Sequence, residues 1–574
     1  MRFFFFILFI GVSQLALGQV KLHINTLDSS STIISSYDIE TEFATKNRAK
    51  KAAEVIIPQL INDGYIAASL DKWQCDSITC NATIFTGKKY KWARLDKGNV
   101  DEYALSKIGF RDKLYNNKLL SQNQLAQLFE KLIAHYENNG YPFASVKLDS
   151  VSIKNEIVSA QLYLEKNQLT TIDSISIIGS AKIIPIYLYN YLDIKPGATY
   201  NEENISRIST RITELPFLKQ KQPFEVLFTT DYNKLTLFLD NKKASKFDGV
   251  LGILPSGNSD KILFTGDIKL LLINSLGRGE LINLNWRKLQ NQTTDLKVNG
   301  AYPFVFNTPF GIEAKFVLYK RDTTFQDVQG MVGVQYILPR GNYFKVFADQ
   351  KESRLLSTKG MENISKLPNQ IDVNNTTYGL GLRSEKLDYK FNPTRGYQFI
   401  IEGGAGTRQI IKNANLPDEI YADIALTTLQ LNGTGYFNYF IPIKKQAAIK
   451  MGVKGAYRYS EQLFKNELYR IGGLLTLRGF DEESINASSY AIGTIEFRYL
   501  LEQNSYTYLF IDGGYYENNS IEEFKSDFPF GFGAGISFET KAGIFSLNYA
   551  LGYQENQLAP IRAAKIHFGF VNFF

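Results

Sequence analysis

Apolar residues in the first part of the chain, up to about residue 243, follow helical spacing in some stretches and alternate in others. Lys46–Leu60 places its apolar side chains on one helical face, and Ser121–Tyr136 repeats this spacing. Each predicted helix is followed by a Gly-Tyr pair, Gly64-Tyr65 and Gly140-Tyr141. Because these pairs are roughly 75 positions apart, they indicate a duplicated module.

A third, more divergent copy follows the first two. A strand pattern at Ile172–Ile178 leads to a turn at Pro196-Gly197 and then to Tyr200. A helix is predicted over Glu202–Leu215, and strands over Phe224–Thr229 and Leu235–Leu239. Each copy has the order β-α-α-β-β. We therefore predict three small α+β domains, at residues 19–90, 91–168 and 169–243.

From residue 244 to the end, helical spacing disappears and strict alternation replaces it. Phe530–Phe538 and Phe545–Leu551 are clear examples, with apolar residues at every second position and small or polar residues between them. Alternation in pieces of about ten residues is the signature of a transmembrane antiparallel β-barrel, and about 16 strands are predicted. A soluble β-sandwich is the competing interpretation.

The connections between the predicted strands differ in length in a regular way. Those after even-numbered strands are short and turn-like, whereas those after odd-numbered strands are often long and polar. The short ones are Leu276–Gly279, Pro339–Gly341, Asn392–Gly396, Ile441-Pro442 and Lys541–Gly543; the long ones include Lys351–Asn375, Thr407–Glu419 and Tyr459–Ser488. Short turns at one end and long loops at the other are typical of membrane barrels with a periplasmic N-terminal region.

Composition supports an exported membrane protein. Residues 1–18 have a basic start, a short apolar run and the small residues Ala16 and Gly18, as a cleaved signal peptide does. No later stretch is apolar over the ~18 residues that a membrane-spanning helix needs. The chain has 34 Tyr and 41 Phe, which suits the aromatic girdles of a barrel. Its net charge of +7 is modest for this length, and we expect no nucleic-acid partner.

Catalytic and metal chemistry have little support in the sequence. No nucleophile, base and orienting group recur together at a recognisable spacing, so we expect no enzyme activity. With three His and two Cys, no metal site is predicted. Cys75 and Cys80 are separated by four residues, which suits either a disulfide across a tight hairpin in an oxidising compartment or two free thiols.

The predicted loop between strands eleven and twelve is too apolar for a purely solvated loop. It contains Leu477, Arg478, Gly479 and Phe480, and we expect it to fold back into the lumen with Arg478 at its tip. A guanidinium held away from water needs carboxylate partners. Alternation places Glu496 and Asp512 on the lumen face, so these two are the candidate partners. An ordinary ladder of lumen charges is the alternative.

These residues resemble the BamA/TamA family of outer-membrane assembly factors, which combine periplasmic POTRA modules with a sixteen-stranded barrel. The family's loop tip, Val or Ile followed by Arg-Gly and an aromatic residue, corresponds to Leu477–Phe480, with Leu as a conservative departure. Its F-x-D-x-G strand motif corresponds to Phe510, Asp512 and Gly514, and its nearby Glu to Glu496. The resemblance covers nearly the whole mature chain.

The resemblance implies a location in the bacterial outer membrane, with the POTRA modules in the periplasm. It implies no cofactor. Partners would be the lipid bilayer, unfolded outer-membrane or secreted client proteins, and a periplasmic or inner-membrane protein at the POTRA modules. Exposed POTRA strand edges would receive client segments by β-augmentation.

The resemblance also implies that the seam between the first and last strands opens sideways to lipid. Gly249 and Gly252 in the first strand and Gly569 in the last would weaken pairing there. The terminal Phe574 resembles the C-terminal signal by which barrels are themselves assembled.

Several functions remain open at this stage. Three predicted modules resemble TamA more than BamA, which usually has five, so a TamA-like assembly factor is preferred and a general BamA-type insertase comes next. A transporter for one dedicated exoprotein usually has two modules and a helix that plugs the lumen, and residues 19–37 show no convincing helix. A passive porin gives the N-terminal modules no role.

Overall fold

The computed structural model describes residues 20–28, 31–255, 262–288, 293–390, 392–540, 543–555, 557–558 and 564–573. The predicted signal peptide lies outside these residues. The described residues up to Ile172, with Ala198–Glu203, form one compact unit, and Asp173–Gly197 with the residues from Asn204 onward form a second. Each unit is described by itself. No helix among the described residues is long and apolar enough to cross a membrane.

The first module of the first unit is a four-stranded sheet packed against helix α2. It contains β1 (Val20–Thr26), α1 (Ser31–Ile34), β2 (Glu42–Phe43), α2 (Lys46–Asn62), β3 (Ser69–Cys75) and β4 (Thr79–Phe85), with the sheet order β2-β1-β4-β3. The Thr45 side chain accepts a hydrogen bond from the Arg48 amide and so caps α2. The predicted apolar face of α2 supplies the core, through Ala49, Ala53, Ile56 and Leu60. Cys75 and Cys80 face each other across β3 and β4 and form a disulfide.

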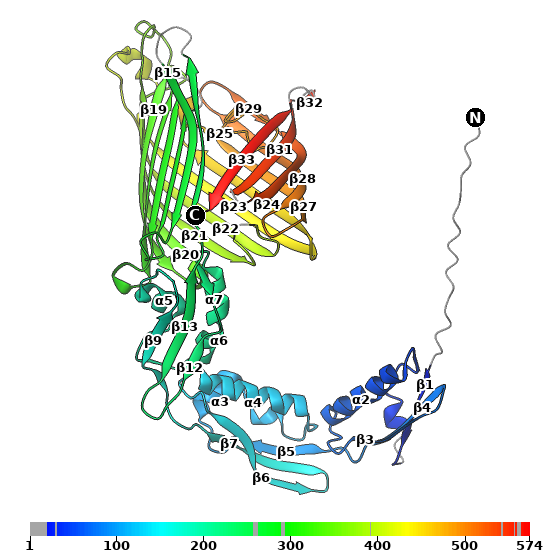
Figure 1. The fold of residues 1–574 in the computed structure, drawn as a ribbon. Coiled ribbons are helices and arrows are strands. Elements are labelled where there is room, and N and C mark those ends of the chain that lie inside the picture. The colour runs from blue at the N-terminus through cyan, green and yellow to red at the C-terminus, as the bar shows by residue number, and fades with distance from the viewer. Residues whose placement is uncertain are drawn as a thin grey trace, which may run out of the picture. The chain divides into compact units, whose positions relative to one another are not determined.

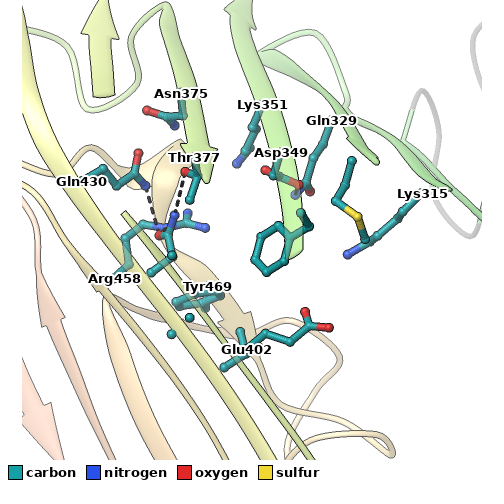
Figure 2. A pocket seen from close by; sticks show the side chains of 17 residues that line it. Lys315, Gln329, Asp349, Lys351, Asn375, Thr377, Glu402, Gln430, Arg458 and Tyr469 are labelled. Carbon is teal, nitrogen blue, oxygen red and sulfur yellow. Dashed lines mark hydrogen bonds between the residues drawn. The ribbon is translucent and has the colours of Figure 1, made fainter. Parts of the chain in front are cut away.

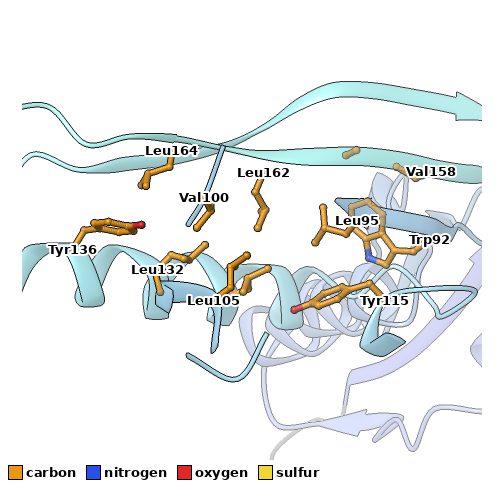
Figure 3. Packing of buried hydrophobic residues seen from close by; sticks show 13 residues of the cluster. Trp92, Leu95, Val100, Leu105, Tyr115, Leu132, Tyr136, Val158, Leu162 and Leu164 are labelled. Atoms are coloured by element: carbon orange, nitrogen blue, oxygen red, sulfur yellow. The ribbon is translucent and has the colours of Figure 1, made fainter. Parts of the chain in front are cut away.

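The second module repeats this topology. It contains β5 (Lys91–Asp96), α3 (Glu102–Ile108), α4 (Gln122–Glu137), β6 (Ser145–Lys154) and β7 (Ile157–Glu165), with the sheet order β5-β7-β6. Trp92 and Leu95 of β5 pack with Leu132 of α4 and Leu162 of β7 in the core that Figure 3 shows between the helices and the sheet. In both modules the first and last strands are parallel neighbours, and the strand just before the last one is antiparallel to it.

The repeated Gly-Tyr pair occupies equivalent positions in the two modules. Gly64 and Gly140 both have left-handed backbone conformations, φ +99° and +93°, which glycine adopts without steric cost. The Gly64 carbonyl accepts a hydrogen bond from the Tyr90 amide, just before β5. The Gly140 carbonyl accepts one in the same way from the Thr170 amide, just before β8 (Thr171–Ile172). Each pair therefore ends a helix and holds the start of the segment that follows the module.

The third α+β region lies mainly in the second unit. Its elements there are β9 (Ser174–Ile178), α5 (Pro185–Leu192), α6 (Glu202–Ser206), α7 (Ile208–Glu214), β11 (Leu218–Gln220), β12 (Glu225–Leu227) and β13 (Lys234–Asn241). The start of α6, with β8 and its partner β10 (Ala198–Thr199), belongs to the first unit. β9 and β13 are parallel neighbours, and β12 is antiparallel to β13, as in the other modules. The prediction of one helix over Glu202–Leu215 is wrong in one respect, because the structure has two helices there, α6 and α7, separated at Arg207.

The rest of the second unit is a closed antiparallel barrel (Figure 1). Among the described residues, sixteen strands form its wall, and the short strands β29 (Phe524–Asp527) and β32 (Gln557–Leu558) extend it locally. The sixteen are β14 (Lys246–Pro255), β15 (Ile262–Ile273), β16 (Leu281–Lys288), β17 (Thr294–Tyr302), β18 (Phe310–Arg321), β19 (Phe325–Ile337), β20 (Tyr343–Leu355), β21 (Val373–Leu387), β22 (Gly396–Ile410), β23 (Thr427–Lys444), β24 (Ala447–Tyr459), β27 (Ser489–Leu500), β28 (Tyr506–Asn519), β30 (Phe530–Thr540), β31 (Gly543–Gln554) and β33 (Lys565–Phe573). The predicted fold class and strand number are confirmed.

The predicted alternation determines which side chains face outward. In β28, Leu509 and Ile511 are 63% and 59% exposed, whereas Asp512 between Ile511 and Gly513 is 1% exposed. β27 shows the same pattern, with Ile495 outward and Glu496 buried. The outer surface is therefore apolar, as a lipid-facing wall requires, and the ionisable residues of these strands face the lumen.

Some predicted connections are longer or shorter in the structure. Ile441-Pro442 is not a turn, because β23 continues through it to Lys444 with a register shift there. The loops predicted at Lys351–Asn375 and Thr407–Glu419 begin later, since β20 and β22 extend to Leu355 and Ile410. Polar residues in those strand ends obscured the alternation. Lys541 and Ala542 of another predicted turn lie outside the described residues.

One short turn of the barrel contacts the third region. The Ile184 amide before α5 donates to the Gly277 carbonyl (2.7 Å), and the Asn274 side chain donates to the Lys182 carbonyl (3.0 Å).

Short 3-10 helices occur at η1 (Asp112–Leu114), η2 (Val305–Asn307), η3 (Pro339–Gly341), η4 (Asp418–Tyr421) and η5 (Lys465–Glu467). Both η2 and η3 contact α5 of the third region. The short connections that contain them are therefore at the end of the barrel next to the third region.

We predict that Asp101 makes the second module sensitive to acid. Its carboxylate accepts hydrogen bonds from the Tyr136 hydroxyl and from the Ala104 amide (2.8 Å), and these bonds lower its pKa. A carboxylate with a lowered folded-state pKa stabilises the fold above its unfolded pKa of about 3.9, and this stabilisation is lost as pH falls through the folded value. Asp101→Asn should remove that loss and, as a weakened helix cap, cost about 1 kcal/mol at neutral pH.

Urea unfolding followed by Trp92 fluorescence, in a background with Trp73 and Trp286 changed to Phe, measures this effect between pH 3 and 7. Asp112→Asn removes the same charge from an exposed turn of the same module and is the control. Equal acid sensitivity of wild type and Asp101→Asn would contradict the prediction.

Candidate functional site

The long connection between β24 and β27 folds as a compact element. Its segments Tyr469–Ile471 (β25) and Ile485–Ala487 (β26) pair as a small hairpin. Between them, Leu477 and Phe480 of the predicted tip are buried in an apolar cluster with Ile471 of β25 and Tyr516 of β28 in the wall. This packing explains why the loop is more apolar than a solvated loop would be, and it fixes the backbone on both sides of Arg478.

Arg478 is held by both predicted carboxylates. Its Nε and Nη2 donate to the two oxygens of Asp512 at 2.6 and 2.7 Å, and its Nη1 donates to Glu496 Oε2 at 3.0 Å. The guanidinium carbon lies 3.5 Å from the centre of the Phe510 ring, a cation–π contact. All four side chains are buried. A bidentate, desolvated arrangement of this kind fixes both the position and the orientation of the tip.

The charged cluster extends beyond the predicted residues. Arg498 Nε donates to Glu496 Oε1 at 2.7 Å, and its Nη1 donates to Asn392 Oδ1 at 3.1 Å in the connection between β21 and β22. The Thr494 hydroxyl donates to Asp512 Oδ1 at 2.8 Å. Each buried carboxylate therefore has more than one donor, which offsets the cost of removing it from water.

Glycines allow the tip to lie directly against the wall. A Cβ on Gly531 of β30 would lie 1.8 Å from the Arg478 carbonyl oxygen, and one on Gly552 of β31 would lie 2.6 Å from that of Gly479. Gly479 itself has φ +95°. Gly514 of the strand motif packs against β27, where a Cβ would lie 2.5 Å from the Ala491 carbonyl oxygen. The backbones thus approach to distances that no larger residue permits.

Sequence reasoning missed a second anchor of the same loop. Arg408 of β22 donates through Nε and Nη2 to the two oxygens of Glu467, both at 2.8 Å, and each side chain is 1% exposed. Asn466 donates to Ser353 of β20 at 2.7 Å. Alternation in β22 could have placed Arg408 in the lumen, but no spacing rule relates it to a loop residue 59 positions away.

The predicted seam residues lie near the barrel closure but do not pair with each other. Gly249 and Gly252 of β14 pair with Ile268 and Thr265 of β15, and Gly569 of β33 pairs with Ser546 of β31. Phe574 lies outside the described residues. The described pairs across the seam are Lys246–Phe573 and Phe247–Asn572. Pairing there therefore involves the base of β14 and the end of β33, where Figure 1 shows the red strand approaching the first strands.

A small polar cavity lies in the lumen beside the base of the loop (Figure 2). Its volume of about 220 Å³ is below the ~300–1,000 Å³ typical of small-molecule sites. Lys315, Lys351 and Arg458 face Asp349 and Glu402 around it, so neither sign of charge dominates. We assign it no ligand. Among the described residues, no group of three or more His, Cys, Asp or Glu side chains could hold a metal ion.

The sixteen-stranded wall, the inward-folded loop and the repeated α+β modules define a class, a transmembrane β-barrel with N-terminal POTRA-like modules. A model described as the Omp85 superfamily domain matches residues 274–574, more than half of the chain, so this protein belongs to the Omp85 superfamily. Proteins of this family are β-barrels of the bacterial outer membrane and act there in protein insertion or secretion. The recognised family is confirmed, whereas the specific likeness to TamA stays a prediction.

Two solved CdiB structures share the fold at low sequence identity. CdiB from Escherichia coli is 12% identical, with 92% of this chain and 98% of that chain covered and a TM-score of 0.54. CdiB from Acinetobacter baumannii is 14% identical, with 84% and 89% covered and a TM-score of 0.51. BamA from Haemophilus ducreyi lacking POTRA domains 1–3 is 14% identical, with 84% and 98% covered and a TM-score of 0.44. No curated protein matches the chain in sequence.

We predict that Arg478→Ala releases the loop tip from the wall. The substitution leaves Asp512 and Glu496 without their shared cation, a cost of roughly 3–5 kcal/mol for a buried pair that loses one partner. We expect a folded barrel whose loop between β25 and β26 is cut by added protease, whereas the wild-type loop resists. Arg354→Ala, which removes a half-exposed arginine from β20, should leave the loop protected. Equal protection of the Arg478 variant and wild type would show that the ion pairs do not hold the tip.

Proposed function

We propose that this protein is a TamA-like assembly factor that inserts or translocates client proteins at the outer membrane by lateral opening of its barrel. The observation that carries the proposal is the small number of residue pairs between the first and last strands of the barrel. Two described residue pairs join β14 to β33, whereas β14 pairs with β15 along its whole length. A seam held by few backbone hydrogen bonds opens at lower cost than any other strand pair of the wall.

An opened seam would present two strand edges to the bilayer. Backbone amides and carbonyls that face hydrocarbon without partners are costly, so an open edge favours pairing with an incoming strand. A client β-strand satisfies this need and is itself inserted by doing so. The part of β14 from Asp248 to Pro255 pairs with no described residue of β33. This free edge is long enough to template such a strand.

The N-terminal modules supply further strand edges. β6 is the outer strand of the second module, and its residues Val151 and Ile153 are both exposed. An exposed edge with apolar side chains suits extended client or partner segments that bind by β-augmentation. We propose the module boundaries 19–90, 91–168 and 169–243, with the barrel from residue 244, and a periplasmic location for all three modules.

The anchored loop favours lateral opening over passage through the lumen. The buried ion pairs of Arg478 and Arg408 hold the loop inside the barrel at two points, and both would have to break before a polypeptide could pass. This anchoring supports an insertase more than a transporter for one exoprotein.

We predict that a covalent lock on the seam abolishes function. Cysteines that replace Phe247 and Asn572, which are register partners, should form a disulfide on oxidation and stop client assembly, with recovery after reduction. The matched control replaces Phe497 and Leu509, register partners in β27 and β28, where a bond should have no effect. Full activity with an efficiently locked seam would refute lateral opening and favour transport through the lumen.

Depletion of the protein should distinguish the functions that belong to this family. We expect the outer-membrane proteome to lose a few barrel proteins, as a specialised assembly factor requires. Broad loss of barrels would instead indicate a general BamA-type insertase. Loss of a single secreted protein, with the barrels unchanged, would indicate a dedicated secretion transporter and contradict the proposal.

A further inference from the structure

The three residues that follow the loop tip, Asp481, Glu482 and Glu483, form ion pairs with two separate parts of the wall. Asp481 Oδ1 lies 2.6 Å from Lys565 Nζ. Glu483 Oε1 lies 2.5 Å from Arg287 Nη2, and Glu482 Oε2 lies 3.6 Å from Arg287 Nη1. Three consecutive carboxylates thus reach two cations on different strands.

The two cations stand on opposite sides of the seam. Lys565 is the first residue of β33, the last strand, and Arg287 belongs to β16 near the start of the barrel. The wall order here is β33-β14-β15-β16, so the seam lies between them. The loop segment therefore connects the two edges of the barrel wall that meet at the seam. Only two described backbone pairs join these edges directly.

A second contact strengthens the attachment to the N-terminal side. The Arg470 guanidinium lies 3.7 Å from the centre of the Tyr319 ring of β18, and its Nε is 3.5 Å from Glu483 Oε2. The Tyr319 hydroxyl is 3.4 Å from the same oxygen. Glu483 is thereby surrounded by donors from β16, β18 and β25. An ordinary ladder of lumen charges pairs neighbouring strands, as Arg287 also does with Asp295, and does not require a loop that reaches both sides of one seam.

We propose that Asp481–Glu483 is an ionic clasp that keeps the seam closed, with Lys565 and Arg287 as its receptors on the two sides. The inference rests on the proposed function in one respect, namely that the seam opens during work. It adds which contacts control the opening. The clasp residues are positioning residues, because they act through the strands they hold and not on the client.

Burial determines which contacts break first. Around Arg478 and its two carboxylates the side chains are at most 10% exposed, whereas those of the clasp range from 23% for Arg287 to 72% for Asp481. Exposed ion pairs are weak and are screened by salt, while a buried pair is strongly destabilised when one partner is lost. The tip therefore stays on β27 and β28 during opening, and the pairs with Arg287 and Lys565 release the seam.

Spin-label distances across the seam in the full-length protein, in lipid nanodiscs, test the clasp. Labels on cysteines at Trp286 and Ile566 report on β16 and β33, and the described native cysteines do not compete because they are disulfide-bonded. The triple variant Asp481→Asn, Glu482→Gln, Glu483→Gln should raise the ratio of long to short distances by roughly two- to five-fold for each pair removed. The exchange Asp481→Lys with Lys565→Asp should restore the short distance that either single change loses.

Salt and a control variant separate the clasp from a general loss of structure. In wild type, raising the salt concentration from about 0.05 M to 0.5 M should lengthen the distance, because exposed ion pairs are screened, and the triple variant should no longer respond. Lys525→Gln breaks an ion pair with Glu555 that does not cross the seam, and should have no effect. Unchanged distances in the triple variant, or an equal change in the control, would overturn the clasp.

The two proposals fail in different ways. If the triple variant opens as expected and a disulfide-locked seam still assembles clients, the clasp stands and lateral opening as the working step is wrong. If the triple variant keeps the wild-type distances and the locked seam is inactive, lateral opening stands and the clasp is wrong.

Discussion

The need to pair every backbone amide and carbonyl that faces lipid governs this structure. In the part of the chain that the structure describes, sixteen strands meet that need by closing on themselves, and alternation then places apolar side chains outward and polar ones in the lumen. A closed ring has one place without a covalent turn, where β14 meets β33. The same constraint that makes the wall stable therefore leaves the seam held by backbone pairing alone, and our proposal places the entry of a client strand there.

The lumen is organised by buried arginines. Arg478 and Arg408 each bind one carboxylate bidentately, and they fix the loop to the wall at its tip and at its base. Beyond the tip, ion pairs with more exposed side chains connect the loop to β16 and β33. In the proposed clasp, this gradient from buried to more exposed ion pairs gives the loop a fixed part and a releasable part.

Sequence analysis predicted the features that arise from local or periodic patterns. Alternation gave the strand number and the inward positions of Glu496 and Asp512, and the loop motif linked both to Arg478. Contacts between distant segments that follow no motif could not be predicted from the sequence. The ion pairs of Arg408 with Glu467 and of Lys565 with Asp481 are examples. The register at the seam could not be predicted from the sequence either, because glycines at 249, 252 and 569 indicate weak pairing but not which residues face each other. Ile441-Pro442 misled the turn assignment, since proline occurs in a strand where the register shifts.

The docking site of the loop tip has a consequence for the order in which the barrel is built. Its surface is assembled from Glu496 of β27, Asp512 of β28, Gly531 of β30 and Gly552 of β31. Before these four strands are joined, Arg478 has no desolvated partners and remains hydrated. Insertion of the tip is thus a late event that requires a finished C-terminal wall. A nascent barrel with a misregistered strand in this half cannot bury the arginine and stays distinguishable from a completed one.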